Sequence, residues 1–163
     1  MTADAAGSIG MMPGDTLVHA TAVESAGNAI LITGPTASGK SDLALRMIAW
    51  PMTGLGLQPF HLLADDQVLL TPAGSTLLAR PPRTIAGRIE VRGLGLVDLP
   101  HATSALLRLI VDLTPADMIE RMPESETRCV AGTTLPAIRL NAFEPSAPLK
   151  AALALRQVIT GVD

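Results

Sequence analysis

Short apolar runs bounded by turn residues recur along the chain and predict a domain built mainly from strands. A four-residue loop at 24–27 is expected to join the first two strands, which pairs Val23 with Asn28 and places His19 opposite Ile32. The predicted strands cover residues 17–23, 28–33, 60–64, 67–70, 76–79, 106–113, 127–131 and 137–143.

Three segments have the pattern of helices. Residues 41–49 are apolar around most of the helical circumference and precede Trp50-Pro51, where a helix is expected to end. Residues 115–122 carry a proline in the first turn, and residues 147–159 close the chain. Because strands follow one another with few helices between them, the pattern favours an α/β fold with a mixed sheet.

The length and composition are those of one folded domain. The 163 residues are 48% hydrophobic and 17% charged, which is enough apolar material for a core. Residues 1–15 contain three glycines and a proline and show no apolar periodicity. We therefore expect a flexible leader at 1–15 and a single domain at 16–163.

Charge and aromatic content argue against nucleic acid as a partner. Fifteen acidic residues against twelve basic ones give a formal net charge of -3, so the chain has no excess positive field for a phosphate backbone. Aromatic residues make up 2% of the chain, which leaves few platforms for stacking bases of a single strand.

Cysteine use and hydropathy indicate a reduced compartment. The single cysteine, Cys129, cannot form an internal disulfide, and the N-terminus lacks the pattern of a signal peptide. No stretch approaches the roughly 18 uninterrupted apolar residues of a membrane span. We expect a cytoplasmic protein that is not embedded in a membrane.

The strongest chemical signal is a Gly-rich loop that matches the pattern G-x-x-x-x-G-K-[ST] without a mismatch. It follows a predicted strand and opens a predicted helix, which is the context the motif requires. Its backbone N–H groups and the helix N-terminus would hold phosphates, the lysine would contact the outer phosphates, and the hydroxyl would bind Mg²⁺. The eight residues of this P-loop are Gly34, Pro35, Thr36, Ala37, Ser38, Gly39, Lys40 and Ser41.

Further polar residues are candidates for binding a metal ion or accepting a proton beside the phosphates. Asp65 and Asp66 follow the strand at 60–64, so one could hold Mg²⁺ while the other takes a proton from a hydroxyl; a solvated turn would have the same sequence. Glu90 stands among apolar residues and also fits an ordinary surface strand. From the hairpin register, His19 could reach the phosphate site or an aspartate, although a lone histidine in a strand is often structural.

Taken together, residues 17–19, the P-loop, 63–66 and 89–98 resemble the catalytic domain of HPr kinase/phosphorylase in order and approximate spacing. The segment Ile89-Glu90-Val91-Arg92-Gly93-Leu94-Gly95 is the most specific part, and the resemblance covers residues 16–154. It implies a P-loop kinase fold like that of phosphoenolpyruvate carboxykinase. It also implies ATP-dependent phosphorylation of a serine in the phosphocarrier HPr, which regulates the phosphotransferase system, and phosphorolysis of the product.

The resemblance also implies roles for individual residues. Lys40 and Ser41 would be the phosphate and metal contacts, and Glu90 a second Mg²⁺ ligand beside Asp65. Asp66 would be the base that deprotonates the serine, with assistance from His19. Arg121 matches a family arginine near the active site. The family usually assembles as a hexamer, so a homo-oligomer is one expectation for this chain.

Departures from the family keep other readings open. The family's N-terminal domain is absent from this sequence, which resembles the shortened form found in alphaproteobacteria. Residues 35–38 differ from the usual loop interior, and residues 137–145 replace a basic segment tied to dephosphorylation. These two departures motivate one alternative, an ATP-sensing module without catalysis. A small-molecule kinase is another alternative, because such an enzyme also needs a P-loop with a nearby aspartate. The P-loop also resembles that of tRNA dimethylallyltransferases, which are about twice as long and need basic surface.

Overall fold

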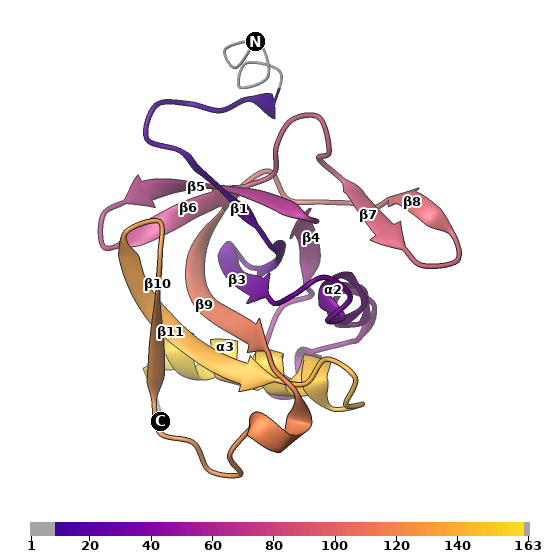
Figure 1. Ribbon diagram of the computed structural model, residues 1–163, viewed down its shortest axis with the longest axis vertical. Coiled ribbons are helices and arrows are strands. Elements are labelled where there is room, and N and C mark those ends of the chain that lie inside the picture. Colours follow the sequence, from indigo (N-terminus) through magenta and orange to yellow (C-terminus); the bar gives the residue numbers. More distant parts are fainter. Residues whose placement is uncertain (1–8, 162–163) are drawn as a thin grey trace.

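A curled, nine-stranded mixed sheet organises the molecule in the computed structural model, which describes residues 9–161 (Figure 1). The neighbouring strands run in the order β1-β5-β6-β9-β3-β2-β4, and β11 also pairs with β9 and carries β10. Its strands are β1 (Thr16–His19), β2 (Thr21–Ser25), β3 (Asn28–Thr33), β4 (His61–Ala64), β5 (Gln67–Ala73), β6 (Thr76–Arg80), β9 (Ala105–Leu113), β10 (Glu126–Val130) and β11 (Thr133–Leu140). The predicted mixed sheet with few helices is confirmed.

Two α-helices pack against one face of this sheet. Helix α2 (Lys40–Ala49) ends where Pro51 holds Trp50 in an extended conformation, and α3 (Ala147–Thr160) follows β11. A short hairpin of β7 (Arg88–Val91) and β8 (Gly95–Asp98) forms a separate sheet that projects beside α2 (Figure 1). The short 3₁₀ segments are η1 (Thr53–Leu55) and η2 (Ala116–Met118). None of the helices within 9–161 is long and apolar enough to cross a membrane.

Strand β3 carries apolar side chains on both faces, and each face packs into a separate hydrophobic core. Ile30 and Ile32 belong to the core beneath α2 and α3, whereas Leu31 belongs to a second core with residues of β1, β5 and β6. The sheet curls so that these three strands fold over the face opposite the helices. A continuous apolar run is the pattern expected of a strand buried on both sides.

The predicted register of the first hairpin is wrong. Ser25, rather than Val23, pairs with Asn28, and the turn consists only of Ala26 and Gly27, both with positive φ. This is the tight turn whose twist suits two antiparallel strands. Thr21 therefore lies opposite Ile32 in place of His19.

The strand predicted at 17–23 is two strands. It divides at Ala20: β2 continues beside β3, while β1 leaves to pair with β5. His19 thereby lies opposite Gln67 rather than on the hairpin with β3.

The helix predicted at 115–122 is also wrong. Only the 3₁₀ turn η2 forms, and the following residues to 125 are irregular. Pro123 disfavours helical conformation at Met122, and Met118 and Met122 are exposed, so a longer helix would have no apolar face to bury.

Part of the expected leader makes specific contacts. Residues 1–8 lie outside the described residues, but Asp15 accepts hydrogen bonds from the Met12 N–H at 2.6 Å, from Thr71 and from Arg80. Burial alone would raise the pKa of the Asp15 carboxyl, but these hydrogen bonds and the charge of Arg80 outweigh it and hold the pKa below its ordinary value.

Candidate functional site

Four parallel strands end at the same edge of the sheet and define the candidate site. β4 and β3 both run antiparallel to β2, and β9 runs parallel to both β3 and β11. The P-loop follows β3, Asp65 follows β4, Thr114 follows β9 and Asn141 follows β11. Ligands of open α/β sheets bind at the carboxyl ends of such strands.

The two end glycines of the P-loop are required by close packing. A Cβ on Gly34 would lie 2.6 Å from the Ser38 Oγ, and one on Gly39 would lie 2.8 Å from the Cβ of Ala142. Gly39 also has a φ of 96°, in the left-handed region that favours glycine. The loop is thus folded tightly on itself and against the segment that follows β11.

The positive charge of the site comes from Lys40 and the start of α2. The Lys40 ammonium donates hydrogen bonds to the carbonyl oxygens of Gly34 at 2.9 Å and Pro35 at 3.0 Å, so it lies across the beginning of the loop. No side chain caps the N-terminus of α2, where Gly39 is the cap residue. The free N–H groups of the first helical turn favour an anion at this position.

Asp65 is joined directly to the P-loop. Its Oδ1 accepts hydrogen bonds from the Ser41 hydroxyl at 2.7 Å and the Thr21 hydroxyl at 2.9 Å, and its Oδ2 accepts one from the Glu90 N–H at 2.9 Å. The side chain is buried, yet all three donors are neutral. None of these donors carries a positive charge, so the buried carboxylate has no cation beside it and its oxygens suit a metal ion.

Asp66 lies in the turn between β4 and β5, and His19 lies at the end of β1, which pairs with β5. Asp66 is exposed and has a φ of 66°, a conformation that aspartate tolerates better than most residues. Its carbonyl accepts a hydrogen bond from the Ala20 N–H at 3.1 Å, while His19, also exposed, pairs with Gln67. The histidine is therefore adjacent to the acid pair, through β5 rather than through the predicted hairpin.

Glu90 and Arg121 are related to this cluster in different ways. Glu90 is tied to it by its backbone, and its side chain is exposed on β7. Arg121 is exposed in the irregular segment after η2, and within residues 9–161 no hydrogen bond or ion pair joins it to the P-loop or to the acid pair. The structure thus joins Ser41 and Asp65 beside Lys40, and no such bond ties Arg121 to them within the described residues.

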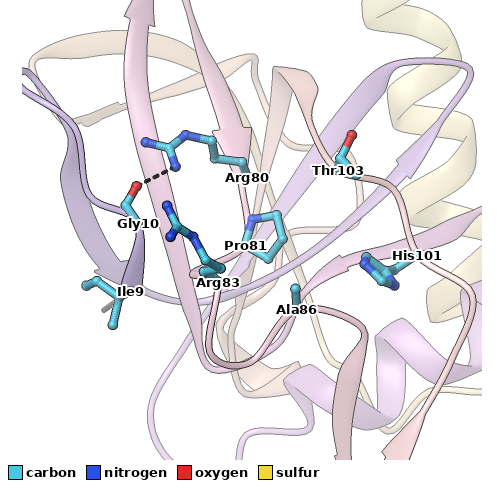
Figure 2. A pocket seen from close by; sticks show the side chains of 8 residues that line it. All are labelled: Ile9, Gly10, Arg80, Pro81, Arg83, Ala86, His101 and Thr103. Carbon is cyan, nitrogen blue, oxygen red and sulfur yellow. Dashed lines mark hydrogen bonds between the residues drawn. The ribbon is translucent and has the colours of Figure 1, made fainter. Parts of the chain in front are cut away.

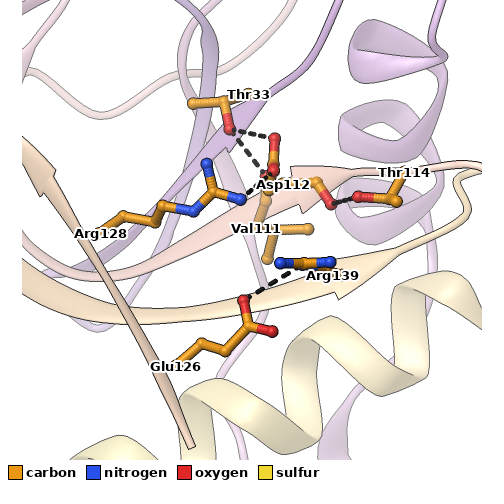
Figure 3. Close-up of polar contacts among 7 residues, drawn as sticks. All are labelled: Thr33, Val111, Asp112, Thr114, Glu126, Arg128 and Arg139. Atoms are coloured by element: carbon orange, nitrogen blue, oxygen red, sulfur yellow. Dashed lines mark hydrogen bonds and ion pairs between the residues drawn. The ribbon is translucent and has the colours of Figure 1, made fainter. Parts of the chain in front are cut away.

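A second aspartate also reaches the edge of the sheet beside the P-loop. Asp112 on β9 lies opposite Thr33, the residue before Gly34, and accepts a hydrogen bond from its hydroxyl at 3.2 Å (Figure 3). Arg128 of β10 pairs with the other carboxylate oxygen at 2.6 Å. Asp112 is therefore paired with a cation, whereas none of the ion pairs among residues 9–161 involves Asp65.

The donor set near Ser41 fits a magnesium ion shared with phosphates. No group of three or more His, Cys, Asp or Glu side chains within the described chain could hold a metal by itself. Asp65 and Ser41 supply hard oxygen donors only 2.7 Å apart. Mg²⁺ typically takes one or two protein oxygens and completes its octahedron with water and phosphate oxygens, so this pair is sufficient.

Two cavities stand out within residues 9–161, and one of them opens beside the P-loop. It has a volume of about 420 Å³ and is lined by residues 35–38, 113–116 and 141–143. The other, about 230 Å³, lies between the leader and β6, where Arg80 donates a hydrogen bond to the Gly10 carbonyl (Figure 2). Arg80 also pairs with Asp15. Only the first is continuous with the phosphate-binding loop.

Sequence reasoning missed several residues of the site. Thr21 and Asn141 carry no motif, and Asp112 is a lone acid near the end of an apolar run, which is the one signal that could have singled it out. These three residues belong to the site only because the strands that carry them lie beside β3 or end at the same edge of the sheet, and a sequence pattern does not show which strands are neighbours.

Comparison with known proteins shows the family of this chain. The family model described as HPr Serine kinase C-terminal domain matches residues 11–140. The HPr kinase/phosphorylase of Clostridium acetobutylicum is 36% identical over 86 residues, which cover 53% of this chain and 26% of that protein. That of Bordetella pertussis is 38% identical over 119 residues, covering 66% of this chain and 36% of that protein.

A solved structure shares the fold. The structure titled Hpr(Ser) kinase/phosphatase from Coxiella burnetii has a TM-score of 0.72 and 22% sequence identity, and the match covers 91% of this chain and 99% of that chain. The fold and the Gly-rich loop define a P-loop domain of the HPr kinase type. The chain belongs to the HPr serine kinase C-terminal domain family. It spans about a quarter to a third of the length of the two curated relatives.

Proposed function

We propose that this chain is an ATP-dependent serine protein kinase domain that phosphorylates HPr or an HPr-like phosphocarrier and so regulates a phosphotransferase system. The single observation that carries the proposal is the bond between Ser41 of the P-loop and the buried Asp65, in a chain of the HPr serine kinase family. This bond joins a phosphate-binding loop to an acid suited to a metal.

The binding roles follow from the charges of the site. The P-loop backbone and Lys40 hold the phosphates of ATP, and Ser41 and Asp65 hold the magnesium ion. When bound, Mg²⁺ neutralises charge on the transferred phosphoryl group. Glu90, whose backbone is fixed to Asp65 at 2.9 Å, is proposed as a further ligand on the same side.

In the transfer step, Asp66 is proposed to take the proton of the acceptor serine. As the serine hydroxyl oxygen of the acceptor forms a bond to the γ-phosphorus, the bond from that phosphorus to the leaving oxygen of ADP breaks, and Asp66 accepts the serine proton. Exposure of Asp66 supports this role because a protein substrate can reach it. His19, on the adjacent strand, assists by orienting Asp66 or the hydroxyl.

Two roles rest on the family resemblance. Arg121 is proposed to approach the transferred phosphate from the segment after η2. In the reverse reaction, inorganic phosphate would attack phosphoserine to give pyrophosphate and the free serine, and Asp66 would return the proton as an acid.

The experiment incubates the chain with ATP, Mg²⁺ and a purified HPr-type phosphocarrier and detects phosphoserine by mass spectrometry. The controls are a phosphocarrier whose acceptor serine is changed to alanine and the Lys40→Ala variant of this chain. We expect phosphoserine on the phosphocarrier that keeps its acceptor serine and none on the serine-to-alanine form. The Lys40→Ala variant should form no phosphoserine. The reverse reaction is tested by incubating the same chain and its variant with phosphorylated HPr and inorganic phosphate and measuring the pyrophosphate formed.

Two results would overturn the proposal. Transfer to small molecules but not to HPr would make the chain a small-molecule kinase. Nucleotide binding without transfer to either would make it an ATP-sensing module.

A further inference from the structure

The strand order gives the P-loop two chemically different sides. β2 and β4 lie on one side of β3 and bring Asp65, whereas β9 and β11 lie on the other. The acid side carries the charge suited to a metal and to the transferred phosphate. The opposite side carries the cavity of about 420 Å³.

This cavity is mainly apolar and is contiguous with the phosphate-binding backbone. Its walls are residues 35–38 of the P-loop, residues 113–116 between β9 and η2, and residues 141–143 after β11. Its volume lies within the roughly 300 to 1,000 Å³ of small-molecule sites, which are typically apolar with a few polar groups.

Phe143 stands out among the residues that line this cavity. The residue is 69% exposed, and its ring lies beside Gly39, where a Cβ would be 3.3 Å from the ring Cε1. The other phenylalanine, Phe60, is buried in the core. An exposed apolar ring next to a phosphate-binding loop is an available stacking face.

The loop that carries this ring is held in place despite the exposure of the ring. Arg46 of α2 donates hydrogen bonds to the carbonyls of Ala142 and, at 3.2 Å, Glu144. The Phe143 N–H donates to the Asn141 Oδ1 at 2.9 Å. Because the backbone is restrained on both sides of Phe143, a ligand would meet a ring whose point of attachment is already fixed.

We propose that this cavity binds the nucleoside of ATP, with the base stacked on Phe143. The inference rests on the proposed function in that ATP is the nucleotide. With the phosphates in the P-loop, this placement directs the terminal phosphate toward Asp65 and Asp66 and the base toward β9 and β11. Phe143 is then a determinant of nucleotide affinity that takes no part in holding the phosphates.

The test compares ATP with inorganic tripolyphosphate, which has the same phosphate chain without a nucleoside. Calorimetry in the presence of Mg²⁺ would measure both affinities for the full chain and for Phe143→Ala. We expect Phe143→Ala to weaken ATP binding by about tenfold, since stacking of one base on an aromatic side chain supplies that much. Tripolyphosphate binding should stay within about twofold of the unchanged chain.

Three further variants serve as controls. Phe143→Trp keeps an aromatic face and should retain ATP affinity. Met122→Ala removes a side chain that is 88% exposed and lies outside the cavity, and it should change neither affinity. Lys40→Ala should weaken both ligands, because it acts on the phosphates.

The inference is overturned if Phe143→Ala leaves ATP affinity unchanged or weakens both ligands equally. Unchanged ATP affinity with loss of HPr binding or of self-association would assign Phe143 to a protein contact instead. Failure of the proposed function is distinguishable, because it appears as absent transfer to HPr whatever the two affinities are.

Discussion

The hydroxyl of Ser41 and the carboxylate of Asp65 are hydrogen-bonded at 2.7 Å, although 24 residues separate them in the chain. The bond crosses from the first turn of α2 to the end of β4. It makes the P-loop and the acid pair one structural unit, so changes to either residue should affect metal-dependent binding first.

Ser41→Ala is therefore expected to reduce the effect of Mg²⁺ on ATP affinity while leaving metal-free ATP binding unchanged. The gain in ATP affinity that Mg²⁺ provides should fall by at least about tenfold, which is the loss that follows removal of a group supporting a metal ligand. Titrations of ATP with and without Mg²⁺ would measure it. Ser41→Thr, which preserves the hydroxyl, is the matched control, and an equal loss in both titrations would contradict the role.

Asp66→Asn should abolish most of the phosphoryl transfer without changing ATP binding. Loss of a general base typically lowers the rate by about a hundredfold or more. Asparagine tolerates the positive φ of 66° at this position, so the fold should be retained. Single-turnover transfer and the ATP dissociation constant would be compared, and unchanged turnover would remove Asp66 from the base role.

Gly39→Ala should lower both thermal stability and phosphate affinity. The new Cβ would lie 2.8 Å from Ala142 in a backbone with a φ of 96°. The matched control is Gly56→Ala, which has a φ of 71° but open space around it. Both should lose about 1 to 2 kcal/mol from backbone strain, as measured by denaturation. Only Gly39→Ala should also lose tripolyphosphate binding. The same tripolyphosphate affinity in the two variants would argue against packing of the 141–143 loop on the P-loop.

Asp15→Asn should destabilise the protein at neutral pH and have less effect in acid. Asp15 has a lowered pKa, so its contribution is present above the pKa of the unfolded chain and is lost as pH falls through the folded pKa. Denaturant unfolding should show a deficit of about 1 to 2 kcal/mol at pH 7, which decreases below about pH 4. A deficit that does not vary with pH would mean that packing, rather than charge, is lost.

Local patterns predicted the parts of the site that depend on adjacent residues. The P-loop, the start of α2 after it and the end of that helix before Pro51 are all local, because steric limits and capping act over a few residues. The strands at 28–33 and 106–113 were predictable from uninterrupted apolar runs for the same reason.

Pairings over longer distances were less predictable. The four-residue loop assumed at 24–27 shifted the hairpin register, since sequence pattern does not show that Ala26 and Gly27 make the turn alone. The helix at 115–122 failed because its apolar residues find no surface to cover, and this depends on the rest of the fold.

The sequence by itself determined that the chain has a P-loop motif, two adjacent aspartates after a strand and the family to which it belongs. The tertiary structure alone decided that Asp65, rather than Asp112, remains without a cationic partner, and that Phe143 lies beside Gly39. The physical reason is that a motif describes the backbone of one segment. Charge pairing and cavity shape arise where strands distant in sequence end at the same edge of a sheet.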